Sequence, residues 1–243
     1  MDTLRIVTGA AGLVGSALVE HLGVLPGRLL ALDTYPGPTL APVTVLDVRS
    51  RDLTELINRH AEGAARLELY HCAGTVPTLR SIHDTHLAVF RSTVEDNLVC
   101  AYAALHAVAD VAGNRGVPVG AVLLSSVGAT RAHRYHVAYD AAKAGVESLA
   151  RAFTLEHGTY LSARCVALGP LAESRTTAED GPLAEALLAL MPRGRYPRLA
   201  DLVQAIAAYA APAFDDSAGH TLTLDAGLSV QLRPGTVERQ PSS

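Results

Sequence analysis

The chain has 243 residues, of which 49% are hydrophobic and 18% charged, so it can bury a large core. Its 24 acidic and 20 basic side chains give a net charge of −4, which argues against nucleic acid or an anionic membrane as its main partner. We expect no membrane span, and no signal peptide because Met1 leads directly into a strand pattern. The widely spaced Cys72, Cys100 and Cys165 are expected to be buried, reduced thiols of a cytoplasmic protein.

Short apolar runs alternate with longer segments of helical periodicity. The predicted strands are Leu4–Thr8, Arg28–Asp33, Val43–Asp47, Arg66–His71, Val119–Ser125, Arg164–Leu168 and Thr221–Asp225. Most are apolar without alternation, which is typical of parallel strands buried on both faces. The predicted helices are Leu13–Leu22, Asp52–His60, Thr93–Ala112, Val137–His157 and Leu199–Ala211. The alternation predicts one α/β domain over residues 1–232, with a doubly wound, seven-stranded parallel sheet and helices on both faces.

Two stretches interrupt this alternation. Thr75–Leu87 is predicted as a polar connection. Leu171–Pro197 is predicted as a mobile lid, with a helical piece at Leu183–Met191 between glycine and proline breaks. The last residues, 233–243, are polar and are predicted to form a loose tail outside the domain.

A glycine-rich turn follows the first predicted strand and opens the first predicted helix. Gly9, Gly12 and Gly15 let the backbone turn sharply and approach a pyrophosphate, which then lies on the free N–H groups of the helix. Asp33 ends the second predicted strand, where a carboxylate can bind both hydroxyls of an adenosine ribose. A glycine turn can also serve tight packing alone, and Asp33 can be a solvated loop acid. Their positions together favour a dinucleotide site.

A serine pair and a tyrosine–lysine pair carry the catalytic prediction. Ser126 follows a predicted strand, at the sheet edge where its hydroxyl can hold a reacting oxygen. Tyr139 and Lys143 are four residues apart in a predicted helix, so they share one face. An isolated phenol has a pKa of about 10, and we expect the Lys143 ammonium to lower the pKa of Tyr139. The alternative is a pair of exposed helix residues, which the upstream serines and glycine turn disfavour.

With these motifs the sequence resembles the short-chain dehydrogenase/reductase family, in its compact single-domain branch. The resemblance implies a Rossmann fold and a catalytic set of Asn97, Ser126, Tyr139 and Lys143. It further implies that Asn97 bends its helix and anchors a water linking Lys143 to solvent. The motifs and the resemblance together imply no metal, and assign cofactor binding to Gly9, Ala11, Gly12, Leu13, Val14, Gly15, Asp33, Thr34, Asp47, Val48, Cys72, Ala73, Gly74, Tyr139, Lys143 and Pro170.

Some positions depart from the pattern of this family. Where the family has Asn-Asn-Ala-Gly after the fourth strand, this chain has His-Cys-Ala-Gly at residues 71–74. His71 can join a proton relay or, as we favour, hydrogen-bond a backbone group at the strand end. Leu171 replaces the glycine of the family's Pro-Gly after the sixth strand, which puts a side chain close to the nicotinamide. The threonine that contacts the carboxamide in the family falls on Thr176 or Thr177.

The sequence therefore predicts an NAD(H)-dependent oxidoreductase that moves a hydride between the nicotinamide and a carbonyl or secondary alcohol, with Tyr139 as the acid/base. The alternatives are a dinucleotide-binding regulatory or structural protein without turnover, and an epimerase or lyase of the same family. The expected partners are a small-molecule substrate and further copies of the chain, as a homodimer or homotetramer. Arg131–His136 is predicted to form a polar, potentially cationic lip of the site, which suits a substrate with an acidic or phenolic group. The equally favoured alternative is that this segment is a solvated loop at a subunit contact.

Overall fold

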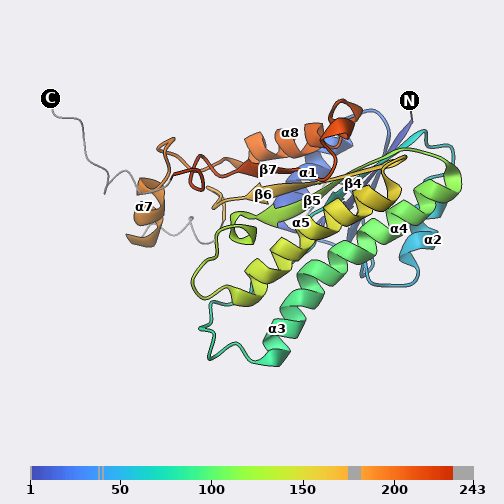
Figure 1. The fold of residues 1–243 in the computed structure, drawn as a ribbon. Coiled ribbons are helices and arrows are strands. Elements are labelled where there is room, and N and C mark those ends of the chain that lie inside the picture. Colours follow the sequence, from blue (N-terminus) through green and yellow to red (C-terminus); the bar gives the residue numbers. More distant parts are fainter. Residues whose placement is uncertain (1, 38, 40, 175–181, 232–243) are drawn as a thin grey trace.

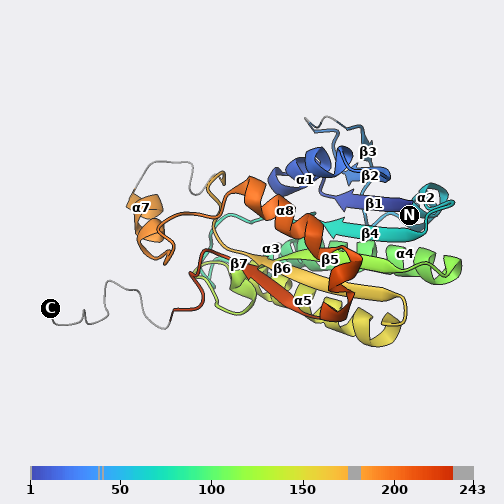
Figure 2. The same cartoon turned by 90° about the horizontal axis from the view of Figure 1, so that it is seen from above.

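The computed structural model describes residues 2–37, 39, 41–174 and 182–231. Seven parallel strands form one sheet in the order β3-β2-β1-β4-β5-β6-β7, as seen from above in Figure 2. The strands are β1 (Thr3–Thr8), β2 (Arg28–Asp33), β3 (Val43–Val45), β4 (Arg66–His71), β5 (Val119–Ser126), β6 (Leu161–Leu168) and β7 (Thr221–Leu224). The strand order reverses between β1 and β4. Ligands of doubly wound sheets bind beyond the carboxyl ends of the strands at such a point.

Helices cover both faces of the sheet, as predicted (Figure 1). One layer contains α1 (Leu13–Gly23) and α8 (Leu199–Tyr209), which pack against each other. The opposite layer contains α2 (Leu53–His60), α4 (Cys100–Arg115) and α5 (Val137–His157). The carboxyl ends of the strands therefore lie between two rows of helices, where residues that follow the strands converge.

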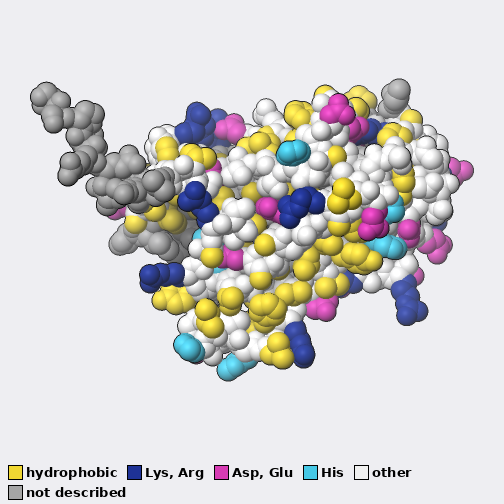
Figure 3. All heavy atoms as spheres, in the orientation of Figure 1, with side chains coloured by type: hydrophobic (Ala, Val, Ile, Leu, Met, Phe, Trp, Pro, Cys, Tyr) yellow, Lys and Arg dark blue, Asp and Glu magenta, His cyan; other side chains and the backbone are white. Residues whose placement is uncertain are grey.

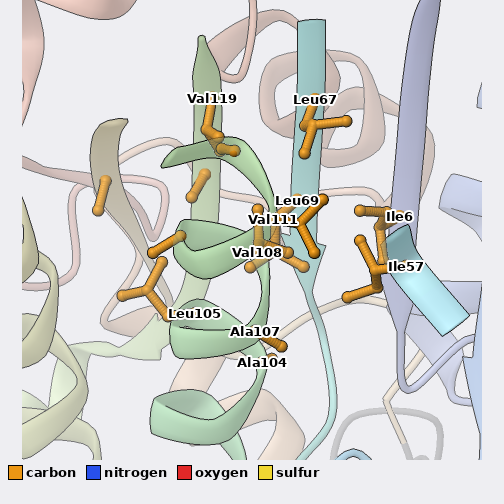
Figure 4. Close-up of a cluster of buried hydrophobic side chains, with 14 of the residues drawn as sticks. Ile6, Ile57, Leu67, Leu69, Ala104, Leu105, Ala107, Val108, Val111 and Val119 are labelled. Carbon is orange, nitrogen blue, oxygen red and sulfur yellow. The ribbon is translucent and has the colours of Figure 1, made fainter. Parts of the chain in front are cut away.

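Apolar side chains between the sheet and each helical layer form two core clusters. Figure 4 shows one of them, in which Leu105, Val108 and Val111 of α4 lie against Leu67 and Leu69 of β4. All five side chains are at least 98% buried, and each such burial contributes about 1.5–3 kcal/mol. The alanines of α4 let this helix approach the sheet closely.

The helix before β5 differs from its prediction. The structure starts it at α3 (Leu87–Val94), earlier than the predicted Thr93, and continues through a π-helical turn (Glu95–Val99) into α4. The predicted polar connection therefore ends at His86, whose extended backbone precedes the helix. The early turns were missed because α3 buries only Thr93 and so carries little apolar periodicity.

Strand and helix ends elsewhere shift by a few residues, most of all at β6, which begins at Leu161 rather than Arg164. In the predicted lid, the structure shows α7 (Pro182–Ala189) close to the expected helical piece. Residues 175–181 and 232–243 lie outside the described part of the chain, and with them Thr176, Thr177 and the predicted tail. Among the described helices, none combines the length and apolarity needed to cross a membrane.

Candidate active site

A cleft of about 370 Å³ opens beyond the carboxyl ends of the central strands. Its walls come from the glycine turn, the residues after β4, the end of β5, the first turns of α5 and the residues after β6. The predicted site residues that line it are Gly12, Leu13, Val14, Gly15, Cys72, Gly74, Asn97, Ser126, Tyr139, Lys143 and Pro170. The structure thus brings all four predicted catalytic side chains to one cleft that also contains the start of α1.

The glycine turn is tightly built and is tied to the end of β2. Gly9 has a φ of +68°, and a Cβ on Gly15 would overlap the carbonyl oxygen of Gly9. Asp33 accepts hydrogen bonds from the backbone N–H of Ala11 at 2.9 Å and of Thr34 at 2.6 Å. Each carboxylate oxygen keeps acceptor capacity for a ribose hydroxyl. With the free N–H groups at the start of α1, this donor and acceptor set fits a dinucleotide.

Tyr139 and Lys143 lie on one face of α5 and point into the cleft beside Ser126. The Lys143 ammonium lies 5.6 Å from the centre of the Tyr139 ring and donates to the carbonyl oxygen of Leu124 at 3.0 Å. Tyr139 and Ser126 both line the cleft, and Ser126 acts on the Tyr139 hydroxyl to lower its pKa. The Ser126 hydroxyl accepts from the backbone N–H of Gly128 at 3.1 Å, which fixes its position at the end of β5. The arrangement presents two hydroxyls to one reacting oxygen.

The expected lowering of the Tyr139 pKa by Lys143 is wrong for the protein in this form. Burial raises the pKa of Tyr139 to about 12, against the opposing effect of the Ser126 hydrogen bond, and the carboxylate of Asp140 raises it further. Burial also lowers the pKa of Lys143 to about 8. The loss of hydration dominates the pKa of Tyr139, so this residue holds its proton at neutral pH.

Asn97 lies in the π-helical turn between α3 and α4. Its side-chain amide donates to the carbonyl oxygens of Thr93 at 2.9 Å and Thr75 at 3.0 Å. Its Oδ1 atom is buried and, within the described chain, has no hydrogen-bond partner. A Cβ on Gly74 would overlap that oxygen and approach the Lys143 ammonium to 3.4 Å, so the glycine keeps open the space between the two groups. A water linking them, as the family implies, stays a prediction.

Two unusual residues follow β4. His71 is fully buried, but its Nδ1 atom pairs with the Thr8 hydroxyl at 2.8 Å, so the predicted backbone partner is wrong. The reason is register, because Thr8 lies directly opposite His71 in the parallel β1–β4 pair. Burial lowers the pKa of His71 to about 3. Cys72 is only partly buried and lines the cleft, contrary to the expected buried thiol, whereas Cys100 and Cys165 are buried as predicted.

The other predicted cofactor contacts do not line the cleft. Gly9, Ala11, Asp33, Thr34 and Ala73 lie in or beside the glycine turn and the ends of β2 and β4. Farther out, Asp47 pairs with Arg49 at 2.7 Å, and Val48 is buried in the core. Their role in cofactor binding, which the family resemblance places at the adenine, stays a prediction. Leu171, by contrast, is buried against the apolar core and does line the cleft, as its replacement of a glycine suggested.

The lip predicted at Arg131–His136 contributes to the cleft two residues that were not among the predicted catalytic and cofactor-binding residues. His133 and His136 line the cleft, and His133 is held by the buried carboxylate of Asp140. Ring and carboxylate atoms of these three side chains lie within 4.8 Å of one another. Asp140 directly follows Tyr139, but an acid in the first turn of a helix is common and gave no signal. The absence of a metal ion at these residues stays a prediction.

The fold and the cleft together define a single-domain Rossmann protein with a serine, a tyrosine and a lysine at its site. The sequence model of a family described as Enoyl-(Acyl carrier protein) reductase matches residues 33–229. The chain therefore belongs to the short-chain dehydrogenase/reductase family and has its oxidoreductase fold. No curated protein matches the sequence at a significant level.

Solved structures with a similar fold cover nearly the whole chain. An oxidoreductase of the short-chain dehydrogenase/reductase family from Burkholderia thailandensis is 24% identical, with 95% of this chain and 94% of that chain aligned and a TM-score of 0.80. Levodione reductase is 21% identical, with coverages of 94% and 98% and a TM-score of 0.81. A 4-hydroxyisoleucine dehydrogenase complexed with NADH is 15% identical, with coverages of 95% and 100% and a TM-score of 0.83. At these identities the likeness shows the fold alone.

Proposed function

We propose that the protein is an NAD(H)-dependent oxidoreductase acting on a carbonyl or secondary alcohol of a small organic substrate, with Tyr139 as the acid/base. The observation that carries the proposal is the convergence of Ser126, Tyr139 and Lys143 on the wall of one cleft. The same cleft contains the start of α1, whose glycine turn is held by Asp33. A substrate oxygen bound beside both hydroxyls would lie next to the cofactor.

The roles of the side chains follow from this arrangement. When bound, the nicotinamide supplies or accepts the hydride. Ser126 would orient the reacting oxygen, and Tyr139 would donate its proton to the oxygen as negative charge develops there. The raised pKa of Tyr139 keeps it protonated at neutral pH, which suits carbonyl reduction. Lys143 would bind the nicotinamide ribose, and Asn97 would hold a water that returns protons to Tyr139 through Lys143.

The charge of Asp33 supports NAD(H) over NADP(H). The 2′-phosphate of NADP would fall where this carboxylate accepts ribose hydroxyls, and two unit charges about 4 Å apart repel by up to about 4 kcal/mol at an effective dielectric of about 20. The next residues, Thr34, Tyr35 and Pro36, offer no compensating cation. Arg28 begins the same strand and pairs with Asp2 at 2.8 Å. The complex of 4-hydroxyisoleucine dehydrogenase with NADH is consistent with this choice.

The experiment is a screen of ketones and secondary alcohols with both cofactors, followed by absorbance of the reduced nicotinamide. With the best substrate, we expect kcat/KM to favour NADH over NADPH by about 10²-fold or more, since each 1.4 kcal/mol is about tenfold. Asp33→Ala should narrow the ratio, while Glu62→Ala, at an exposed acid remote from the cleft, should leave it unchanged. A wild-type preference for NADPH would overturn the cofactor assignment. Turnover without net change of NADH would instead indicate an epimerase or lyase.

We also propose that the chain forms a homodimer or homotetramer. Hydrophobic side chains gather over α4 and α5 on the face shown in Figure 3. Tyr102 there is 47% exposed, and with Leu98 and Leu149 it borders a shallow hollow between the two helices. Light scattering tests the assembly. Substituting Tyr102 and Leu149 together by Ser should weaken an assembly that uses this face.

A further inference from the structure

The wall of the cleft that contains His133 is fixed by one buried carboxylate. Asp140, in the first turn of α5, accepts the backbone N–H of His133 at 2.7 Å and pairs with the Nδ1 atom of its ring at 3.0 Å. A Cβ on Gly128 would overlap the same carboxylate, so the glycine at this position makes room for the Asp140 side chain. Asp140 and Gly128 together therefore hold the ring of His133 in one place.

This pairing settles which ring nitrogen is free. A carboxylate only accepts hydrogen bonds, so the Nδ1 atom of His133 carries a hydrogen and the Nε2 atom is left for another partner. The Nε2 atom accepts a hydrogen bond when the ring is neutral and donates one when the ring is an imidazolium. No described residue hydrogen-bonds that Nε2 atom. The His133 side chain is 40% exposed and lines the cleft. The ring of His136 lies between it and the acid/base, 5.4 Å from the His133 ring and 5.9 Å from that of Tyr139.

The charges around this wall have one sign. Among the described residues that line the cleft there is no carboxylate, whereas Lys143 and His133 are basic, and burial lowers the pKa of the third base, His136. Beyond His133 a second hollow of about 730 Å³ adds Arg134 and His83 between mostly apolar walls. Its one acid, Asp140, is occupied by His133. A concave surface lined by one sign of charge attracts a substrate of the opposite sign.

We propose that His133, positioned by Asp140, binds a carboxylate of the substrate, so that the enzyme acts on oxo acids or hydroxy acids whose acid group is separated from the reacting carbon. In this contact His133 is the imidazolium, which donates from Nδ1 to Asp140 and from Nε2 to the substrate carboxylate, while the carbonyl oxygen lies at Ser126 and Tyr139. This assignment rests on the proposed function, because it takes Tyr139 as the reacting end of the cleft. His136 lies along the substrate between the two ends.

Binding of matched probes tests the proposal without requiring turnover. Calorimetric titration of 4-oxopentanoate, 6-oxoheptanoate and their methyl esters, with and without NAD⁺, compares acid with ester at constant chain length. The oxidised cofactor cannot reduce the ketone, so only binding is measured. We expect at least one acid to bind tenfold or more tightly than its ester. Equal or tighter binding of both esters would overturn the proposal.

Variants separate positioning from charge. His133→Phe should bring the ratio of acid affinity to ester affinity close to one, with the ester affinity unchanged. His133→Gln should restore part of the preference for the acid, because its side-chain amide can donate a hydrogen bond. Asp140→Asn should give an intermediate ratio, while His220→Phe, at an exposed site, should change nothing. A tenfold ratio that survives His133→Phe, or tight Zn²⁺ binding that is lost in His133→Phe, would overturn the proposal. If NAD⁺ does not bind, the proposed function is wrong. The ratio of acid affinity to ester affinity measured without cofactor still tests the role of His133.

Discussion

Two groups of buried polar side chains lie on the same sheet and differ in what surrounds them. At the carboxyl ends of the strands, His71, Asn97 and Lys143 lie beside the cleft. Under α8, Arg66 of β4 and Arg164 of β6 share the carboxylate of Asp215, at 2.9 and 3.0 Å. We refer to Arg66, Arg164 and Asp215 as the arginine cluster.

The two groups differ in whether a ligand can reach their polar atoms. The Arg164 side chain is 0% exposed and lies over the ring of Tyr209, and Arg66 also donates to the carbonyl oxygen of Ala210. The arginine cluster therefore joins two strands to the segment after α8 and borders none of the described hollows. Both groups contain buried atoms without a described hydrogen-bond partner, but only in the cleft group does such an atom, Asn97 Oδ1, lie beside a space that a ligand can enter. Buried polar groups that are closed in serve stability, whereas those that open on a cleft are available for chemistry.

The sharpest test of this contrast is Tyr139→Phe. Removing the hydroxyl eliminates the proton donor while the ring keeps its packing, so kcat should fall by about 10²–10⁴-fold. The melting temperature should change little, and Tyr102→Phe, at an exposed tyrosine of α4, should leave both unchanged. Steady-state rates with calorimetry check this. Retention of more than about a tenth of the wild-type rate, in a step limited by chemistry, would show that Tyr139 is not the acid/base.

Asp215→Asn should have the opposite effect. It leaves Arg66 and Arg164 without their shared carboxylate, and breaking such a buried pair costs about 3 kcal/mol of unfolding free energy. We take the lower end of the usual range because Asp215 is itself 37% exposed. Chemical denaturation measures the loss, and kcat/KM should stay within about twofold of wild type, below 0.5 kcal/mol. Asp216→Asn, its exposed neighbour, is the control; equal losses in both variants would contradict a role for the cluster.

The buried His71 of the cleft group should affect the stability of the protein through its pKa. Its pKa falls from an ordinary 6.5 to about 3 on burial. Between these values the unfolded chain takes up a proton that the folded chain does not, so the free energy of unfolding decreases as the pH falls through this window. At pH 5 the loss is about 2 kcal/mol, since each pKa unit is worth about 1.4 kcal/mol.

His71→Asn can keep a hydrogen bond to Thr8 and should abolish this part of the acid sensitivity. Denaturation curves at pH 7 and pH 5 measure it, with His220→Asn at an exposed histidine as the control. Unchanged acid sensitivity in His71→Asn would mean that the ring is protonated in the folded protein.

The smallest expected effect concerns backbone conformation after β7. Ala226 has a φ of +57°, in the left-handed region, between two hydrogen bonds that the Asp225 carboxylate accepts from Gly227 and Ser229. Glycine relieves this strain, so Ala226→Gly should raise the free energy of unfolding by about 0.5–1 kcal/mol. Ala218→Gly, at a φ of −56°, should lower it instead. Thermal unfolding of both variants tests this prediction. A lower free energy of unfolding in Ala226→Gly would exclude backbone strain at residue 226.

Much of the fold, and the meeting of Ser126, Tyr139 and Lys143 at one cleft, could be predicted from the sequence because both depend on local patterns. Parallel strands buried on both faces are continuous apolar runs, and all seven were found to within a few residues. The relation of Tyr139 to Lys143 follows from helical spacing alone. That of Ser126 to both follows from the rule that strand ends meet at one edge of the sheet. These features can be predicted without knowing which residues pack against them.

The tertiary structure alone decided the environment of each group. The partner of His71 is Thr8, 63 residues away, and no local pattern reports a contact across two strands. Burial, which depends on everything packed around a side chain, reversed the expected direction of the Tyr139 pKa. The pairing of Asp140 with His133 required a turn that folds back onto α5 and a glycine at residue 128 to make room. Sequence spacing determines which residues share an element, whereas desolvation and long-range contact determine what their polar atoms meet.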